Sequence, residues 1–237
     1  VNLAGRSVNC RYNGVNRRAV HDSRVVTTQL LAEAVAACKN PPKVWINSST
    51  ATIYRHAEDR PQGDFDGEVG TGFSVGIAQA WEKAFFDNEN NRVRKVAIRS
   101  AMVLGDEPET VWTVLQRLAR LGLGGRMGNG IQMVSWISDL DFARAVEWLA
   151  ENVAATGTYN VSSPNPVSNA RLMCCVRDSA GRPFGLPATK WMLVLGAFFM
   201  RTETELVLKS RWVIPTRLLK EGFEFQDPEL KKWSSKC

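Results

Sequence analysis

Blocks of apolar residues separated by polar stretches divide the chain into predicted helices and strands. From residue 14 to about residue 38, apolar side chains recur at helical spacing, and a buried strand begins at Val44. Because residues 1–5 are also apolar and strand-like, the order strand, helix, strand predicts a parallel sheet. The helix is expected to have one broad apolar face, made by Val25, Val26, Leu30, Leu31, Ala34, Val35 and Cys38.

The same alternation continues to about residue 161. We predict helices over residues 73–86, 109–121 and 139–152, the last capped by Ser138, and strands over residues 95–100, 131–137 and 157–161. Residues 55–72 are polar, acidic and glycine-bearing, which predicts a surface loop. Beyond residue 163 come helical pieces at 168–178, 188–200 and 203–208. The sequence therefore predicts an α/β domain over residues 1–162 and a small, mainly helical domain over residues 163–237.

Composition removes several classes of protein. Among the 237 residues, the longest apolar run is the ten residues 191–200, which is too short to cross a membrane, and the N-terminus is unlike a secretory signal. The net charge is +6, but basic residues are spread along the chain, so we expect a solvated surface and no nucleic-acid partner. Five cysteines without CxxC spacing indicate reduced thiols, as in a cytoplasmic protein. The apolar run could instead support a contact between two copies in a homodimer.

Metal and triad chemistry are not supported by the residues present. The only two histidines are His21 and His56, and neither belongs to an HxxxH or HExxH arrangement, so no metal site is expected. No GxSxG elbow accompanies them. The glycine-rich residues 122–130 lack GxGxxG spacing and lie between a helix and a strand, which favours a turn over a phosphate-binding loop.

Small hydroxyl residues follow the predicted strand that begins at Val44. Ser48, Ser49 and Thr50 come directly after its apolar residues, and the next strand ends at Arg99 and Ser100. Carboxyl ends of parallel strands meet at one edge of a sheet, where ligands bind in open α/β folds. We expect these side chains to lie together there; the alternative is a Ser/Thr-rich turn without a ligand.

Short segments along the chain resemble the extended short-chain dehydrogenase/reductases, the class that contains nucleotide-sugar epimerases. The segments are Asn2-Leu3-Ala4-Gly5, residues 48–54 (SSTATIY) and residues 128–132 (GNGIQ). Within this class the chain is most similar to the "epimerase family protein" branch, through further pieces such as Trp81-Glu82, Val103-Leu104-Gly105 and Ser135-Trp136-Ile137. The resemblance implies a Rossmann-type doubly wound parallel sheet and a C-terminal domain of unknown function.

The same resemblance implies a nicotinamide cofactor, NADP or NAD with NADP favoured, and an unknown small-molecule substrate. Thr50 takes the place of the catalytic hydroxyl, Ser49 supports it, and Tyr54 is the nearest phenol that could donate a proton, although a packing role for Tyr54 is the alternative. The residues expected to bind the cofactor are Asn2, Ala4, Gly5, Ser48, Arg99, Ser100 and Val103.

Three departures from the family pattern leave the activity open. The glycine-rich pyrophosphate turn belongs to a first βαβ unit that we expect before Val1, because residues 1–5 look like the end of a strand. No tyrosine lies in the 73–86 helix, so the YxxxK proton relay cannot be formed. Ser138 stands where related sequences have histidine. Two functions therefore remain: an NAD(P)-dependent oxidoreductase or epimerase-like enzyme, and a non-catalytic dinucleotide or metabolite sensor or scaffold.

Overall fold

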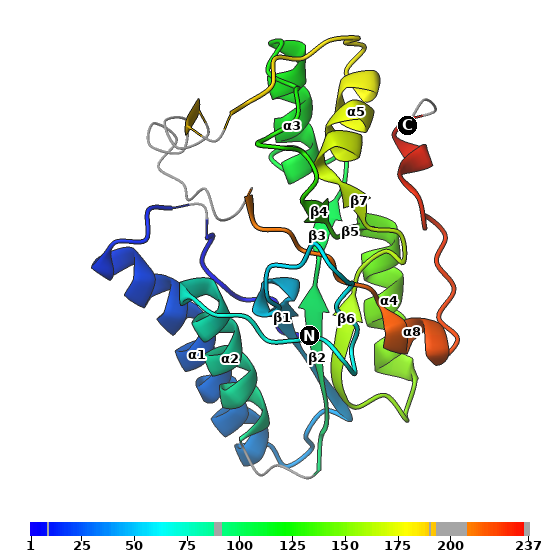
Figure 1. Cartoon of the computed structure of the whole chain (residues 1–237). Coiled ribbons are helices and arrows are strands. Elements are labelled where there is room, and N and C mark those ends of the chain that lie inside the picture. Colours follow the sequence, from blue (N-terminus) through cyan, green and yellow to red (C-terminus); the bar gives the residue numbers. More distant parts are fainter. Residues whose placement is uncertain (9, 88–91, 190, 193–207, 235–237) are drawn as a thin grey trace.

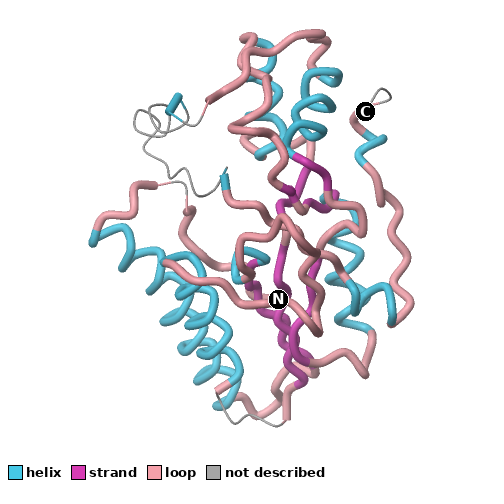
Figure 2. Tube along the Cα trace, viewed as in Figure 1, coloured by secondary structure: helices cyan, strands magenta, loops and turns pink. Residues whose placement is uncertain are grey.

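A short parallel sheet lies at the centre of the molecule. The computed structural model describes residues 1–8, 10–87, 92–189, 191–192 and 208–234. Strands β1 (Val44–Thr50), β2 (Arg94–Ser100) and β6 (Gly157–Val161) are parallel, in the order β1-β2-β6. Asn2 forms a parallel bridge with Asn47, so residues 1–5 lie along the other edge of β1. The predicted parallel sheet is confirmed, and Figure 2 shows its strands in the middle of the fold.

Helices cover both faces of this sheet (Figure 1). Helices α1 (Gly14–Ala37) and α2 (Phe73–Phe86) lie on one face, and α4 (Asp139–Glu151) and α8 (Thr216–Lys220) lie on the other. Side chains alternate along a strand, so Trp45 packs with Phe85 while Ile46 belongs to the cluster around Leu149. The result is a helix–sheet–helix sandwich of the Rossmann type, as predicted.

The predicted strand 131–137 is two strands that belong to different sheets. Strand β4 (Met133–Val134) pairs antiparallel with β7 (Val167–Ser168), whereas β5 (Trp136–Ser138) pairs parallel with β3 (Met102–Leu104). Ser135 separates them because its buried hydroxyl donates to Arg211 O at 2.7 Å and accepts from Val213 N at 2.7 Å. The side chain thereby bonds a third segment at this break.

Beyond these strands, α3 (Val111–Arg120) and α5 (Asn169–Ser179) pack side by side in a lobe at one end of the molecule (Figure 1). Two short 3-10 helices complete the described elements, η1 (Ala51–Ile53) after β1 and η2 (Leu230–Lys232) near the C-terminus. The predicted cap of α4 is confirmed, since Ser138 Oγ accepts from Asp141 N at 3.0 Å. None of the described helices is long and apolar enough to cross a membrane.

Only part of the apolar face predicted for α1 packs, since Val35 contacts the cluster that contains Trp45 and Phe85. Val20, Thr28 and Ala32 are buried, whereas Val26 and Leu30 are 45% and 58% exposed. Seven apolar positions cover too much of the helix circumference for all of them to meet one neighbour. The orientation is set partly by a polar contact, because Trp81 Nε1 of α2 donates to Thr28 Oγ1 at 3.0 Å.

The predicted surface loop, residues 55–72, is partly buried. Gln62 is fully buried and pairs with the later segment around Val213, through Gln62 N to Trp212 O at 2.7 Å and Ile214 N to Gln62 O at 3.1 Å. Its neighbour Asp64 accepts from Asn160 N at 2.6 Å. The backbone of Gln62 and the side chain of Asp64 therefore bond backbone groups of other segments, and composition alone cannot distinguish such a loop from a solvated one.

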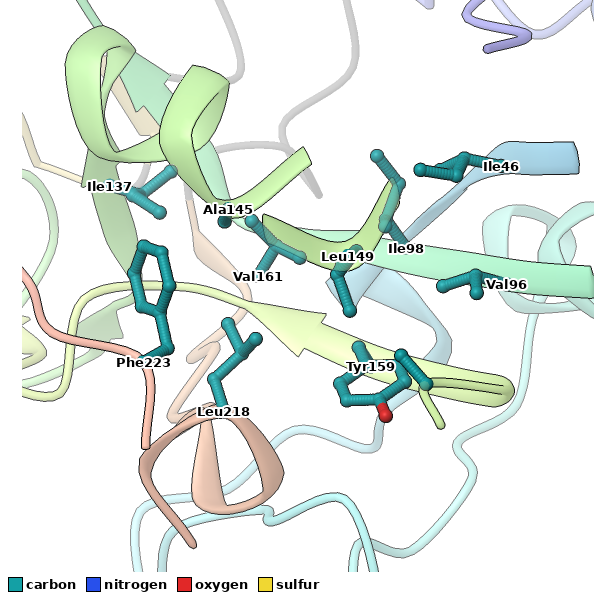
Figure 3. Packing of buried hydrophobic residues seen from close by; sticks show 11 residues of the cluster. Ile46, Val96, Ile98, Ile137, Ala145, Leu149, Tyr159, Val161, Leu218 and Phe223 are labelled. Atoms are coloured by element: carbon teal, nitrogen blue, oxygen red, sulfur yellow. The ribbon is translucent and has the colours of Figure 1, made fainter. Parts of the chain in front are cut away.

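The C-terminal segment returns to the main core. Leu218 and Phe223 are buried with Ile137 and Val161, as Figure 3 shows. The predicted helices 188–200 and 203–208 fall largely outside the described residues. Cys174 is disulfide-bonded, so the prediction that all five cysteines are reduced thiols is wrong.

Arg94 closes the C-terminal end of α4. Its guanidinium donates to Leu149 O at 2.9 Å, Ala155 O at 2.7 Å and Ala150 O at 2.7 Å. Arg94→Met keeps the apolar stem and removes these bonds, so we expect the free energy of unfolding to fall by about 2 kcal/mol. Urea unfolding measures the change. Arg92→Met is the matched control, since Arg92 is exposed and its bond to Ala36 O at 3.2 Å is open to water; an equal loss in both variants would contradict the prediction.

Candidate active site at the carboxyl edge of the sheet

The strand register brings the predicted residues to one edge. Thr50 lies beside Ser100, and one residue earlier Ser49 lies beside Arg99, which in turn lies beside Asn160 of β6. Neighbours in register on parallel strands point to the same face. All four residues therefore lie at the same edge of the sheet, but Ser49 and Arg99 point to one face and Thr50 and Ser100 to the other.

The hydroxyl groups at this edge differ in whether their proton is already donated to another group of the protein. Ser48 Oγ donates to Ser49 O at 3.3 Å, and Ser100 Oγ donates to Ala101 O at 2.9 Å. Thr50 Oγ1 caps η1 by accepting from Thr52 N at 3.2 Å. Among the described residues no acceptor for the Thr50 hydroxyl proton is found, so Thr50 keeps a donor for a ligand.

Ser49 and Arg99 share a carboxylate on α2. Ser49 Oγ donates to Glu82 Oε1 at 2.6 Å, and Arg99 donates from Nε to Oε1 and from Nη2 to Oε2, both at 2.8 Å. The Arg99 and Glu82 side chains are only 14% and 12% exposed. This bidentate pair neutralises the Arg99 charge and fixes α2 against the ends of β1 and β2.

Tyr54 joins the same network from the other side. Its hydroxyl accepts from Arg99 Nη1 at 2.9 Å and donates to Asn160 Oδ1 at 2.8 Å. The side chain is 2% exposed. Burial raises the pKa of Tyr54, and the neighbouring Arg99 guanidinium offsets only part of that rise. The packing role, the alternative stated for Tyr54, agrees with these contacts.

Helix α2 packs apolar residues against the segment that follows β1. Val75 and Ala78 are buried against Ala51 and Tyr54. On this helix, Glu82 is the ionisable side chain bonded to the sheet edge, and it is paired with Arg99. At this edge the Arg99 guanidinium and the Glu82 carboxylate therefore neutralise each other.

The other predicted cofactor residues lie around this edge in different ways. Asn2 Nδ2 donates to Asn47 Oδ1 at 2.7 Å, and Asn2 Oδ1 accepts from Ala4 N at 3.1 Å, which turns the chain towards Gly5. A Cβ on Gly5 would lie 3.2 Å from Arg24 Cζ, so a small residue fits there. Val103 packs against the core around Ile46 and is not part of the polar network.

Three residues of the network were not predicted from the sequence: Glu82, Asn160 and Asp64. Asp64 Oδ2 accepts from Arg217 N at 2.9 Å and from Thr216 Oγ1 at 2.9 Å, so it caps α8 while Oδ1 holds β6. Burial raises the pKa of Asp64, and its hydrogen bonds offset part of the rise. The sequence does contain a signal for Glu82, because this carboxylate lies between Trp81 and Phe85, two apolar residues on the predicted buried face of a helix. Nothing in the sequence connects Asp64 to β6.

Sequence comparison with known proteins shows which family this chain belongs to. The chain is 32% identical to epimerase family protein SDR39U1 of Bos taurus over 240 residues, which span 97% of this chain and 78% of the bovine protein. The chain belongs to the epimerase family proteins. Epimerase family protein ML0860 of Mycobacterium leprae is also 32% identical, over 95% of this chain and 72% of that protein. The predicted family is confirmed.

Structural comparison supports the same assignment. The crystal structure of human epimerase family protein SDR39U1 (isoform 2) with NADPH matches all of this chain and 81% of the human chain, at 28% identity and a TM-score of 0.89. A dTDP-4-dehydrorhamnose reductase from Bacillus anthracis in complex with NADP, at 16% identity and a TM-score of 0.73, shares the fold over 98% of this chain and 78% of the reductase. Residues 188–233 match a domain of unknown function, DUF1731, as predicted for the C-terminal region.

Proposed function

We propose that this epimerase family protein is an NADP(H)-dependent oxidoreductase or epimerase-like protein acting on a small molecule. One observation carries the proposal: the whole chain matches, at a TM-score of 0.89, a human family member whose structure contains NADPH. The carboxyl edge of the sheet, with Thr50 and Ser100 side by side, is where open α/β folds bind such ligands.

The residues present fit one part of the cofactor. The 237 residues contain no GxGxxG turn between a strand and a helix, so the pyrophosphate anchor typical of such folds is not among them. Ala4, Gly5 and Ser48 are small residues beside the end of β1, where the nicotinamide half would lie. When bound, this cofactor exchanges a hydride with the substrate.

The protein's own contribution would come from Thr50. Its free hydroxyl proton would be donated to a carbonyl or hydroxyl oxygen of the substrate and so fix the orientation of the reacting carbon. Ser49 and the Glu82–Arg99 pair would hold the end of β1 in place. Tyr54 is proposed to position Arg99, because its own proton is given to Asn160.

A non-catalytic sensor or scaffold is the second candidate function. It is supported by the absence of tyrosine from α2, residues 73–86, which leaves this helix without the YxxxK pair. A protein with this edge could bind a dinucleotide or metabolite and still lack a group that transfers protons.

Thr50→Ala in the full gene product, with any residues encoded before Val1, separates these candidates. We expect NADPH to raise the thermal unfolding midpoint of both the parent and the variant. We expect turnover of carbonyl substrates to fall about tenfold in Thr50→Ala, because one hydrogen bond to the substrate is lost. Thermal shift and NADPH oxidation measure the two effects.

Thr156→Ala is the control, since Thr156 is exposed at the opposite end of the sheet, where its hydroxyl donates to Lys95 O at 3.3 Å, and turnover should be unchanged. NADPH binding without turnover on any carbonyl substrate would favour the sensor. Absence of stabilisation by both NADPH and NADH would exclude the oxidoreductase and the dinucleotide sensor.

A further inference from the structure

Two loops meet backbone to backbone at the end of the α3–α5 lobe, away from the central sheet (Figure 1). Residues 121–128 follow α3, and residues 181–188 follow α5. Gly125 N donates to Leu186 O at 3.2 Å, Leu186 N donates to Gly122 O at 2.8 Å, and Gly128 N donates to Ala188 O at 2.8 Å. These bonds join the two loops into one surface.

Glycines make this close approach possible. A Cβ on Gly185 would lie 2.5 Å from Gly124 C, and one on Gly125 would lie 2.3 Å from Leu186 O. Both distances are shorter than real Cβ contacts, so a larger residue would force the loops apart. Arg177 also holds this contact between the loops in place, because its Nη1 donates to Gly124 O at 2.8 Å.

Large apolar side chains are exposed along this joint. Leu121, Leu123, Phe184 and Leu186 are 75%, 46%, 68% and 53% exposed. Scattered exposed apolar residues are normal on a protein surface, but four on two bonded loops form a cluster.

The two segments that carry this cluster have only basic charged residues, and Asp178, directly before the second segment, is half-buried and accepts from Ser234 Oγ at 2.8 Å. Residues 111–131 and 179–192 contain no aspartate or glutamate, and they contain four arginines and one lysine. All four arginines are exposed: Arg117, Arg120, Arg126 and Arg182. Together with Leu121, Leu123, Phe184 and Leu186 they are named here the basic apolar face.

We propose that the basic apolar face binds the surface of a membrane that contains anionic lipids. Exposed leucine and phenylalanine side chains can enter the boundary between headgroups and acyl chains, while arginines remain at the headgroups. Each arginine near such a surface strengthens binding about fivefold. This binding needs no membrane-spanning helix, so the short apolar runs that argue against a membrane span do not argue against it.

A second copy of the chain fits this face less well. Symmetric pairing of the same face would bring two sets of arginines together without an acid to neutralise them. Lipid phosphates supply that missing negative charge.

Vesicle co-sedimentation tests the proposal with the full protein. We expect binding to phosphatidylcholine vesicles that contain about one third phosphatidylglycerol, and at least tenfold weaker binding to pure phosphatidylcholine vesicles. The double variant Leu121→Ser with Phe184→Ser, and separately Arg120→Glu with Arg182→Glu, should each lower the partition coefficient at least tenfold.

Matched control substitutions lie on other exposed apolar residues. Val153→Ser with Phe65→Ser, at positions 86% and 68% exposed, should leave vesicle binding unchanged. Thermal unfolding establishes that each variant is folded. Equal binding to both vesicle types, or no effect of the apolar substitutions, overturns the proposal. Binding to soluble polyglutamate as tight as to the anionic vesicles also overturns it, because it identifies an acidic protein partner.

Discussion

Replacing Glu82 with alanine is expected to lower the free energy of unfolding by about 3–5 kcal/mol, which makes it one of the two most damaging substitutions described for this chain. Glu82 accepts both arms of the Arg99 guanidinium and the Ser49 hydroxyl. Without it, a guanidinium that is 14% exposed keeps its charge but loses its carboxylate. The cost comes from that uncompensated charge in a poorly solvated site. Urea unfolding monitored by tryptophan fluorescence measures it.

An exposed ion pair on the same helix provides the control. Lys83 and Asp87 are paired one turn apart with side chains 74% and 58% exposed, so Asp87→Ala should cost less than about 1 kcal/mol. Combining Glu82→Ala with Arg99→Met removes the buried charge, and the double variant should be more stable than Glu82→Ala alone. A double variant as unstable as the sum of both single variants would show that the charge is not the cause.

Asp141→Ala is expected to cost about 3 kcal/mol or more. The carboxylate is fully buried in the first turn of α4 and accepts from Arg144 Nη1 at 2.8 Å, Gln226 N at 2.9 Å and Asp227 N at 2.8 Å. Its negative charge therefore interacts favourably with the positive N-terminal end of the α4 dipole. Its bonds to the Gln226 and Asp227 amides attach the C-terminal segment to α4. Alanine would leave two backbone N–H groups without their acceptor. Urea unfolding and hydrogen exchange of the Gln226 and Asp227 amides measure the change.

Asp139→Ala tests whether the first-turn charge alone explains this effect. Asp139 is exposed in the same helical turn, so its removal should cost at most about 1 kcal/mol. Faster exchange at Gln226 and Asp227 is expected only in Asp141→Ala. Unchanged exchange there would mean that other contacts hold the C-terminal segment.

Elements with a repeated pattern were predictable from the sequence. Residues 73–86 form α2 and residues 157–161 form β6, with the bounds that apolar spacing and flanking glycines indicate. Local periodicity determines such elements because one face of each is buried. The predicted 131–137 strand failed at Ser135, whose partners Arg211 and Val213 are more than 70 residues away.

The candidate site was predictable only in part, for the same reason. Ser49, Thr50, Arg99 and Ser100 come together because the ends of parallel strands always do. The state of each side chain depends on partners from elsewhere in the chain. The Arg99 guanidinium is bonded to the Glu82 carboxylate, and the Tyr54 hydroxyl donates to Asn160 Oδ1. By contrast, the Thr50 hydroxyl proton has no acceptor among the described residues.

During synthesis, the strands β1, β2 and β6 leave the ribosome well before the residues that complete their core. Leu218 and Phe223 pack beside Ile137 and Val161, and Asp64 must wait for Thr216 and Arg217 to find its hydrogen-bond donors. We therefore expect the part of this sheet face that α4 does not cover to stay exposed to solvent until residue 223 has emerged. Such intermediates bind chaperones and aggregate readily. Completing this side of the core thus depends on α8, a short helix near the end of the described chain.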